Sequence, residues 1–494
     1  MLDQALQGIV FRRFDRFDTG ALSVTLPDGS TRSFGPGGAP SATLRVLDNR
    51  FFRRLVRSAD IGFGEAWQKG EIDSPDLTGL LTFFIANRPA AVDAPTRLSL
   101  VGRAFNRLRH LARRNTIGNS RRNIQAHYDL GNEFYRRFLD PTMMYSGAVF
   151  EHPEQSLHDA QLHKIGGLID MATPQPGDRL LEVGCGWGGF ALEAAGRTGC
   201  LVHGLTLSDA QLSLARERMA AAGLSDRVNL EIRDYRRIEG VYDRLVSIEM
   251  IEAVGHEYLD TFFHTCGRAL KTGGRFALQV ITIPDARYDA YRRGADWIQK
   301  HVFPGGNLPS VGALTDSLHR TSRLVVERVE EHGRHYVPTI RHWREKFHRN
   351  WDEIRPFGFD DHFRRTWDYY LAYCEAAFAT GQVHLRGTFA LRTQCRGVAC
   401  DARRDSRRTE KFAGTGKRRP YDSRDEAAGS GKAEPLSLDL EDSGRDGRAG
   451  DRARPTQRRG VACDARRVSL RTEKFAGAGE QRPYASRDKA CHSQ

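Results

Sequence analysis

The sequence predicts an α/β fold built around a mostly parallel, seven-stranded sheet. In the middle of the chain, short apolar runs alternate with helical runs, which is typical of parallel strands joined by helices. A glycine-rich turn follows the first apolar run and opens a helix, as in folds that bind a ligand at the ends of parallel strands. The expected strands cover residues 179–183, 201–205, 228–232, 244–248, 276–283, 324–329 and 384–391.

Composition limits the class of protein. The chain has 494 residues, 39% of them hydrophobic and 28% charged, which is ordinary for a soluble globular protein. No apolar run approaches the length of a membrane-spanning helix, and charged residues interrupt positions 1–18, unlike a secretory signal. We therefore expect a cytoplasmic protein. Its eight cysteines form no C-x-x-C pair, so we expect reduced thiols and no metal site.

The first part of the chain, residues 1–118, is predicted to form a small α+β domain. Residues 21–26 and 30–34 alternate apolar and polar positions around a Pro-Asp-Gly turn, which predicts a β-hairpin. A further strand is expected at residues 43–47 and a short helix at residues 49–58. This domain precedes the part that carries the parallel sheet.

The last part, residues 394–494, differs in character from residues 119–393, which carry the sheet. Three motifs between positions 396 and 421 recur 63 residues later, without helical or strand periodicity. This part holds 24 basic and 16 acidic residues, so it supplies most of the net charge of +13. Because it has few apolar residues to bury, we expect a disordered tail. A nucleic-acid-binding tail is the alternative, but mixed charges and few aromatic residues argue against a nucleic-acid partner.

Residues 98–114 are predicted to form an amphipathic helix. Its leucine, valine and phenylalanine side chains lie along one stripe, and its arginines lie largely outside that stripe. Such a basic helix can bind the anionic headgroups of a lipid surface. The alternative is a helix that connects two domains and exposes its arginines to solvent.

The glycine turn indicates where a cofactor binds. Gly184, Gly186 and Gly189 allow a tight turn and a close approach of the backbone to a ligand, a spacing that also fits dinucleotide binding. Glu182 precedes the first glycine, where methyltransferases commonly carry an acid near the amino-acid end of S-adenosylmethionine. The second strand, moreover, lacks the terminal acid that usually binds an NAD ribose. We therefore expect S-adenosylmethionine as the cofactor.

From residue 127 onward, the chain resembles the cyclopropane-fatty-acyl-phospholipid synthase family, which includes the mycolic-acid methyltransferases. The matching segments are residues 127–132, 144–146, 181–189, 204–208, 252–255, 303–306, 308–310 and 370–374. The resemblance implies a Rossmann-like class I methyltransferase fold. It also implies transfer of a methyl or methylene group from S-adenosylmethionine to the double bond of an unsaturated phospholipid acyl chain, giving a cyclopropane or methyl-branched chain.

The glycine loop and the end of the third strand supply some of the expected cofactor-binding residues. The resemblance implies the others, which lie at 145–146 and after the second strand. Together these residues are Tyr145, Ser146, Glu182, Gly184, Cys185, Gly186, Trp187, Gly188, Thr206, Leu207, Ser208, Gln211, Asp234 and Tyr235. Ser208 and Gln211 also have the spacing of a helix capping box. Asp234 and Tyr235, after the third strand, are placed to bracket an adenine.

The expected catalytic residues also follow from the resemblance. It implies that Glu252, Ile281 and Tyr336 hold a bicarbonate ion, which removes a proton from the alkylated chain, and that Cys374 lies in the active site. A structural role for a buried thiol is the alternative for Cys374. The sequence departs from the family at two other positions, because Gly147 replaces a cysteine and Gln279 replaces a histidine. Both replacements argue against bicarbonate binding.

Glu249 suggests a different base. It stands where the synthases often have glycine, three residues before Glu252. Two carboxylates in a dry pocket raise one pKa toward neutral pH, so we predict that Glu249, or Glu252 itself, takes the proton directly. The alternative is that Glu249 caps a helix or pairs with an arginine.

The expected partner is the surface of a phospholipid bilayer, with the protein bound peripherally to the inner face of the membrane. The chain could also pair as a homodimer. A second functional hypothesis is an N- or O-methyltransferase of a small molecule on the same fold, because plant alkaloid N-methyltransferases look similar.

Overall fold

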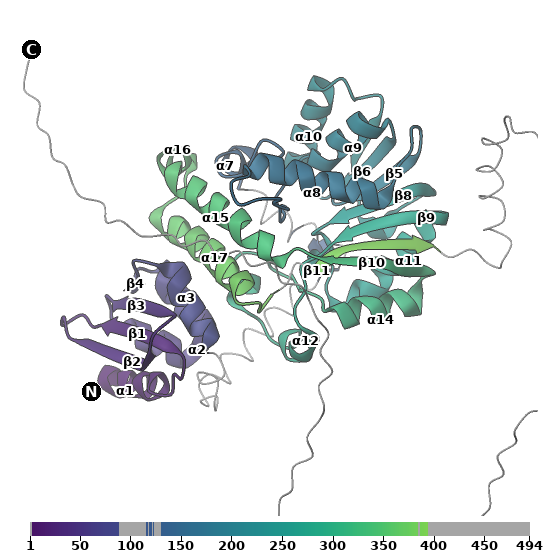
Figure 1. The fold of residues 1–494 in the computed structure, drawn as a ribbon. Helices are drawn as coiled ribbons and strands as arrows, with labels where there is room; N and C mark the ends of the chain where they lie inside the picture. Colours follow the sequence, from purple (N-terminus) through teal and green to yellow (C-terminus); the bar gives the residue numbers. More distant parts are fainter. Residues whose placement is uncertain are drawn as a thin grey trace, which may run out of the picture. The chain divides into compact units, whose positions relative to one another are not determined.

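The computed structural model describes residues 2–87, 115–116, 118–120, 122, 130–383 and 386–393. These residues belong to one compact unit and form a four-stranded and a seven-stranded sheet (Figure 1). The predicted helix at 98–114 and the predicted disordered tail at 394–494 lie outside the described residues. No described helix is both long and apolar enough to cross a membrane.

The larger sheet confirms the predicted mostly parallel α/β fold. Its strands are β5 (Arg179–Val183), β6 (Leu201–Thr206), β7 (Val228–Ile232), β8 (Tyr242–Ile248), β9 (Leu270–Gln279), β10 (Leu324–Glu331) and β11 (Arg386–Thr393). They lie in the order β10-β11-β9-β8-β5-β6-β7. β11 runs antiparallel to both of its neighbours, β9 and β10, and the other neighbouring strands pair parallel. The carboxyl ends of β5, β6, β8 and β9 therefore meet at one edge of the sheet.

The strand β9 differs from the predicted strand at residues 276–283. It begins earlier, at Leu270, and leaves the sheet after Gln279. The chain turns away there because the Ile281 N–H donates a hydrogen bond to the Glu252 carboxylate at 2.5 Å instead of to a neighbouring strand. This turn brings the end of β9 next to the segment that follows β8.

Helices cover both faces of the larger sheet (Figure 1). On one face, α8 (Leu157–Ala172), α9 (Gly189–Thr198) and α10 (Asp209–Ala221) share a buried core with β6 and β7. On the other face, α11 (Leu259–Ala269) and α14 (Val311–Thr321) pack against the centre of the sheet. The link from β7 to β8 contains only the short helix η1 (Tyr235–Arg237). Short 3-10 turns also follow at η2 (Ile251–Ala253), η3 (His256–Tyr258) and η4 (Arg355–Phe357).

The smaller sheet confirms the predicted hairpin. Its strands are β1 (Gly20–Thr25), β2 (Thr31–Gly37), β3 (Ser41–Val46) and β4 (Ile72–Asp73), in the order β2-β1-β3-β4. β1 and β2 pair antiparallel, and β3, the strand expected at 43–47, pairs parallel with β1. The accompanying helices are α1 (Leu2–Phe14), α2 (Arg50–Gln68) and α3 (Leu77–Ala86). The short helix expected at 49–58 is thus the first half of α2, which breaks at Ala59 (φ 47°, ψ −121°) and continues.

A third group of helices joins the two sheets into one unit. It consists of α7 (Asn132–Arg136), α12 (Asp285–Tyr291), α13 (Trp297–His301), α15 (Gly333–Arg349), α16 (Trp351–Ile354) and α17 (Asp361–Ala379). α17 packs against α15 and also against α2 and α3. Gln68 donates a hydrogen bond to Thr366 at 3.0 Å, and Arg344 donates one to Thr78 at 2.9 Å. The division of the chain near residues 118 and 393 stays a prediction.

Gly64 provides a test of this packing, because α2 meets α13 and α17 there. A Cβ atom at Gly64 would lie 2.4 Å from the Trp297 ring and 2.8 Å from the Tyr369 ring. We expect Gly64→Ala to destabilise the protein by about 1–3 kcal/mol, because overpacking displaces rigid rings. Gly167→Ala is the control, since nothing lies within 4 Å of its Cβ position on α8. Equal denaturation midpoints for both variants would contradict this close packing.

Candidate active site

A cavity of about 370 Å³ lies at the carboxyl ends of the central parallel strands. One end is lined by the glycine loop after β5 and by the end of β6. The other end is lined mainly by apolar and aromatic side chains of the helical group, and α2 and α3 contribute Asp60 and Ile85. Helices α2 and α3 and the strand ends of the larger sheet therefore line one cavity.

The glycine loop presents its backbone to this cavity. Gly184, Gly186 and Gly188 have φ angles of 89°, 52° and 78°, in the left-handed region that favours glycine. The Gly184 and Cys185 N–H groups both donate to the Leu205 carbonyl at 2.9 Å, which fixes the loop on β6. Nothing lies within 4 Å of a Cβ atom built on Gly186. A ligand can therefore lie directly against the Gly186 backbone.

Glu182 supplies a buried carboxyl group at this end. Its side chain is buried, and its Oε2 atom has no hydrogen-bond partner. Burial raises the pKa of Glu182 to about 8, and the charge of Lys164 opposes this shift. A buried carboxyl group with a free oxygen suits a positively charged ligand group, such as the ammonium of S-adenosylmethionine, because that charge would favour the ionised carboxylate.

The residues that follow β6 form only half of the predicted capping box. The Ser208 side chain accepts a hydrogen bond from the Gln211 N–H at 3.3 Å and begins α10. The Gln211 side chain instead bonds to the Thr206 hydroxyl at 2.8 Å. Thr206, Leu207 and Gln211 line the cavity, whereas Ser208 supports them from behind.

The predicted pair of Asp234 and Tyr235 around an adenine stays a prediction. Tyr235 lines the cavity, but the Asp234 carboxylate bonds to the Arg236 guanidinium through both oxygens, at 2.8 and 2.6 Å. Gly188 also lies away from the cavity lining. Asn115 and Arg233 line this end although no motif contains them, so sequence reasoning missed both residues.

Glu249 has the most constrained carboxylate of the cavity. Its Oε1 accepts hydrogen bonds from the Gly147 N–H at 2.9 Å and from the Gln279 amide at 2.8 Å. Its Oε2 accepts one from the Tyr336 hydroxyl at 2.7 Å. These donors differ from those of the alternative interpretation, in which Glu249 caps a helix or pairs with an arginine. Gln279 does not line the cavity itself and contacts it through Glu249.

The backbone of Glu249 is strained. Its φ angle is 49°, in the left-handed region that a residue with a Cβ atom enters at a cost of about 1 kcal/mol or more. Its N–H donates to the Gln279 carbonyl at 2.9 Å, which holds this conformation. The strain explains why glycine suits this position, and a glutamate there indicates a use for the carboxylate.

Glu252 lies beside Glu249 with one free oxygen. Its Oε1 accepts from the Ile281 N–H, and its buried Oε2 has no partner. Burial and the charge of Glu249 raise the pKa of Glu252 to about 8, and burial also raises the pKa of Glu249. Cys374 lines the cavity as well, and burial raises the pKa of its thiol, which therefore stays protonated.

The loop at residues 145–148 forms the wall between α8 and the carboxylates. The Lys164 ammonium donates to the Ser146 hydroxyl at 2.7 Å, and the Gln161 amide donates to the Ser146 carbonyl at 2.8 Å. Sequence reasoning missed Lys164 and Gln161. A signal was present, because both polar side chains fall on the buried, mostly apolar stripe of α8, where polar and charged residues are unusual.

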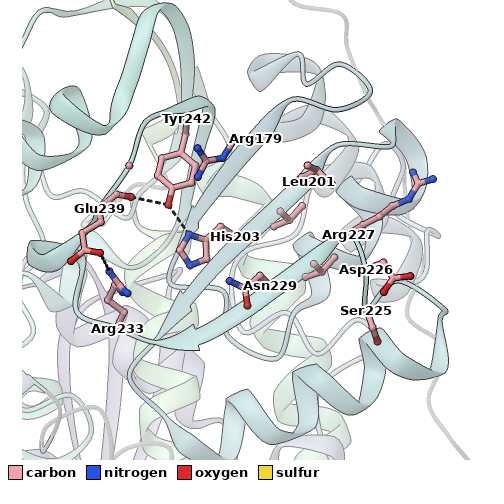
Figure 2. A pocket seen from close by; sticks show the side chains of 13 residues that line it. Arg179, Leu201, His203, Ser225, Asp226, Arg227, Asn229, Arg233, Glu239 and Tyr242 are labelled. Carbon is pink, nitrogen blue, oxygen red and sulfur yellow. Dashed lines mark hydrogen bonds and ion pairs between the residues drawn. The ribbon is translucent and has the colours of Figure 1, made fainter.

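A second hollow lies on the outer part of β6 and β7 (Figure 2). It forms where the short link from β7 to β8 places no covering helix, which leaves Leu201 44% exposed. His203 bonds there to the Tyr242 hydroxyl at 2.6 Å and to Glu231 at 2.7 Å. None of the expected site residues lines this hollow.

The sheet order, the glycine loop and the buried acid beside it define a class I S-adenosylmethionine-dependent methyltransferase. Comparison with known proteins then identifies the family. The model of the family described as mycolic acid cyclopropane synthetase matches residues 116–387. The chain belongs to this family.

Individual relatives agree with this identification. The chain is 39% identical over 374 residues to the tuberculostearic acid methyltransferase of Mycobacterium tuberculosis, covering 73% of this chain and 85% of that protein. It is 34% identical over 355 residues to the cyclopropane-fatty-acyl-phospholipid synthase of Escherichia coli, covering 71% and 87%. A solved mycolic acid cyclopropane synthase, complexed with SAH and CTAB, is 30% identical with a TM-score of 0.51, covering 55% and 98%. The predicted family, fold class and S-adenosylmethionine dependence are confirmed.

Gly186→Val tests the cofactor loop. The branched side chain would enter the open space beside the backbone and would also be strained at φ 52°. We expect S-adenosylmethionine affinity to fall by about tenfold or more in calorimetry. Gly196→Ala on α9, where nothing lies within 4 Å of the new Cβ atom, should bind normally. Unchanged affinity of Gly186→Val would refute this position for the cofactor.

Proposed function

We propose that this methyltransferase acts on the double bond of an unsaturated acyl chain in a phospholipid, giving a cyclopropane or methyl-branched chain. The observation that carries the proposal is the Glu249 carboxylate, held by three donors at the edge of an apolar cavity. The names of the relatives support a lipid substrate, since they include a fatty-acyl-phospholipid synthase.

The cavity beyond Glu249 suits a hydrocarbon chain. Its lining there includes Ile85, Ile298, Phe303, Trp343, Phe378 and Val383. Such a surface binds an acyl chain by excluding water, without specific polar contacts. A dry cavity also protects a cationic intermediate from reaction with water.

S-adenosylmethionine supplies an electrophilic methyl group on a sulfonium. The π electrons of the alkene form the new bond to that methyl carbon, the carbon–sulfur bond electrons stay on sulfur, and a cation remains on the acyl chain. Glu249 then accepts a proton. If this proton comes from the new methyl group, the electrons of the broken C–H bond close a cyclopropane ring. If it comes from a carbon next to the cation, those electrons form a new double bond and leave a methyl branch. Because the Cys374 thiol stays protonated, it competes poorly as a nucleophile.

We further propose that no bicarbonate is needed. The family resemblance implies an ion held near Tyr336 and Glu252, but the Tyr336 hydroxyl, the Gly147 N–H and the Gln279 amide all donate to Glu249. The donors that could hold a second anion are therefore engaged by the carboxylate of the chain. Glu252, whose pKa is raised to about 8, keeps its proton near neutral pH. Burial raises the pKa of Glu249 as well, but its three hydrogen-bond donors oppose that shift and favour the ionised base.

Activity in bicarbonate-free buffer tests this role. We expect the wild-type enzyme to be active there and insensitive to added bicarbonate. Glu249→Gln keeps the size of the side chain but cannot accept a proton, so kcat should fall by about 100-fold or more. Glu252→Gln, the matched neighbour, should keep more activity than Glu249→Gln.

Melting temperature and cofactor affinity of both variants show whether they remain folded. Strong stimulation by bicarbonate together with a fully active Glu249→Gln enzyme would restore the ion as the base. Mass fragmentation of the lipid product distinguishes a ring from a branch.

The proposed location is the inner face of the membrane, with peripheral binding through the basic segment at 98–114. Binding to anionic vesicles should weaken as salt is added, because screening shortens the range of the arginine charges. Reversing Arg107 and Arg113 to glutamate should weaken it further, and neutral vesicles serve as the control. If vesicle binding is unchanged by added salt and by the two arginine reversals, the segment at 98–114 only connects two parts of the chain. The homodimer stays a prediction.

A further inference from the structure

Lys164 is a buried cation that lies behind the lining of the cavity. It lies on α8 with 3% of its surface exposed. Its ammonium donates to the Ser146 hydroxyl at 2.7 Å. A buried ammonium is costly unless negative charges lie nearby, so its surroundings indicate what it stabilises.

Three carboxylates act on this ammonium. Burial lowers the pKa of Lys164 to about 8, and the charges of Glu249, Asp140 and Glu182 oppose that shift, with Glu249 first. A short path also joins Lys164 to Glu249. Ser146, the acceptor of the ammonium, is followed by Gly147, whose N–H donates to Glu249 at 2.9 Å.

We propose that Lys164 is the counter-charge of the Glu249 carboxylate, a positioning residue that keeps the base ionised without touching the substrate. This inference rests on the proposed function, because it requires Glu249 to be the base. Its contribution is electrostatic and acts across the wall formed by residues 145–148.

The other groups that face Glu249 cannot replace this charge. Tyr336, on α15, and Gln279, on β9, are neutral donors. Glu252, after β8, acts in the opposite direction, because two neighbouring carboxylates disfavour each other's ionised form. On α17, Tyr370 and Cys374 lie near Tyr336, and burial raises the pKa of both. The Lys164 cation behind the loop therefore lowers the pKa of Glu249, against the increase that burial and the charge of Glu252 cause.

The test is the pH dependence of kcat/KM for Lys164→Met at saturating S-adenosylmethionine. Glu249 must be ionised to accept a proton, so activity falls below its pKa. Without the cation that pKa rises, and the acidic limb of the profile should move to higher pH by about one unit or more. Lys164→Gln should shift the limb in the same direction.

Gln161→Met is the matched control. It removes the other hydrogen bond from α8 to Ser146 but leaves the charge of Lys164. If Lys164 only holds the loop, the two methionine variants should have the same pH profile, and the inference fails. If the Lys164 variants lose cofactor affinity with no shift of the acidic limb, Lys164 serves Glu182 instead, and the inference also fails.

A failure of the proposed function gives a different result. If Glu249→Gln keeps full activity with an unchanged pH profile, Glu249 is not the base, whatever Lys164→Met does. If Glu249→Gln is inactive but neither Lys164 variant that stays folded shifts the limb, only the counter-charge is overturned. Thermal unfolding transitions identify the folded variants, and Lys164→Gln, which keeps a polar end, provides a second case if Lys164→Met unfolds.

Discussion

A carboxylate in a dry cavity stays ionised only where hydrogen-bond donors or positive charges surround it. The rest of the site is arranged so that the Glu249 carboxylate has such donors. Its three donors belong to the loop at 145–148, to the end of β9 and to α15. Each hydrogen bond to a charged group contributes about 1.5–3 kcal/mol. Together they fix the positions of a loop, a strand end and a helix that are far apart in the sequence. The arrangement requires a left-handed backbone conformation at Glu249, which is strained.

The two ends of the cavity use backbone geometry in opposite ways. At the cofactor end, glycines occupy the left-handed conformations, so that no side chain separates the backbone from the ligand. At the acyl end, the residue with a positive φ angle is a glutamate, whose side chain reaches back to Tyr336. The family resemblance extends over the first end and breaks at the second. In the proposed mechanism, cofactor use therefore remains that of the family while Glu249 replaces the family's proton acceptor.

The charges of the cavity have to be considered together. Glu182, Glu249 and Glu252 are three buried carboxylates around one cavity, and Lys164 is a buried cation that acts on two of them. The three carboxyl groups are therefore not all ionised at once, because three negative charges around one cavity with a single cation are unfavourable in a low dielectric. Burial raises the pKa of all three carboxyl groups, and only at Glu249 do three hydrogen bonds oppose the shift and favour the ionised form.

The sequence alone determined the seven-stranded sheet, the glycine loop and the family, because periodicity and motif spacing are local properties of the chain. It also singled out Glu249, from a glutamate at a position usually held by glycine. Only the tertiary structure decided what these side chains contact. In the tertiary structure, Asp234 forms an ion pair with Arg236, and Lys164 lies behind the wall of the cavity. Hydrogen-bond partners and charges that meet across distant segments depend on packing, which no local pattern encodes.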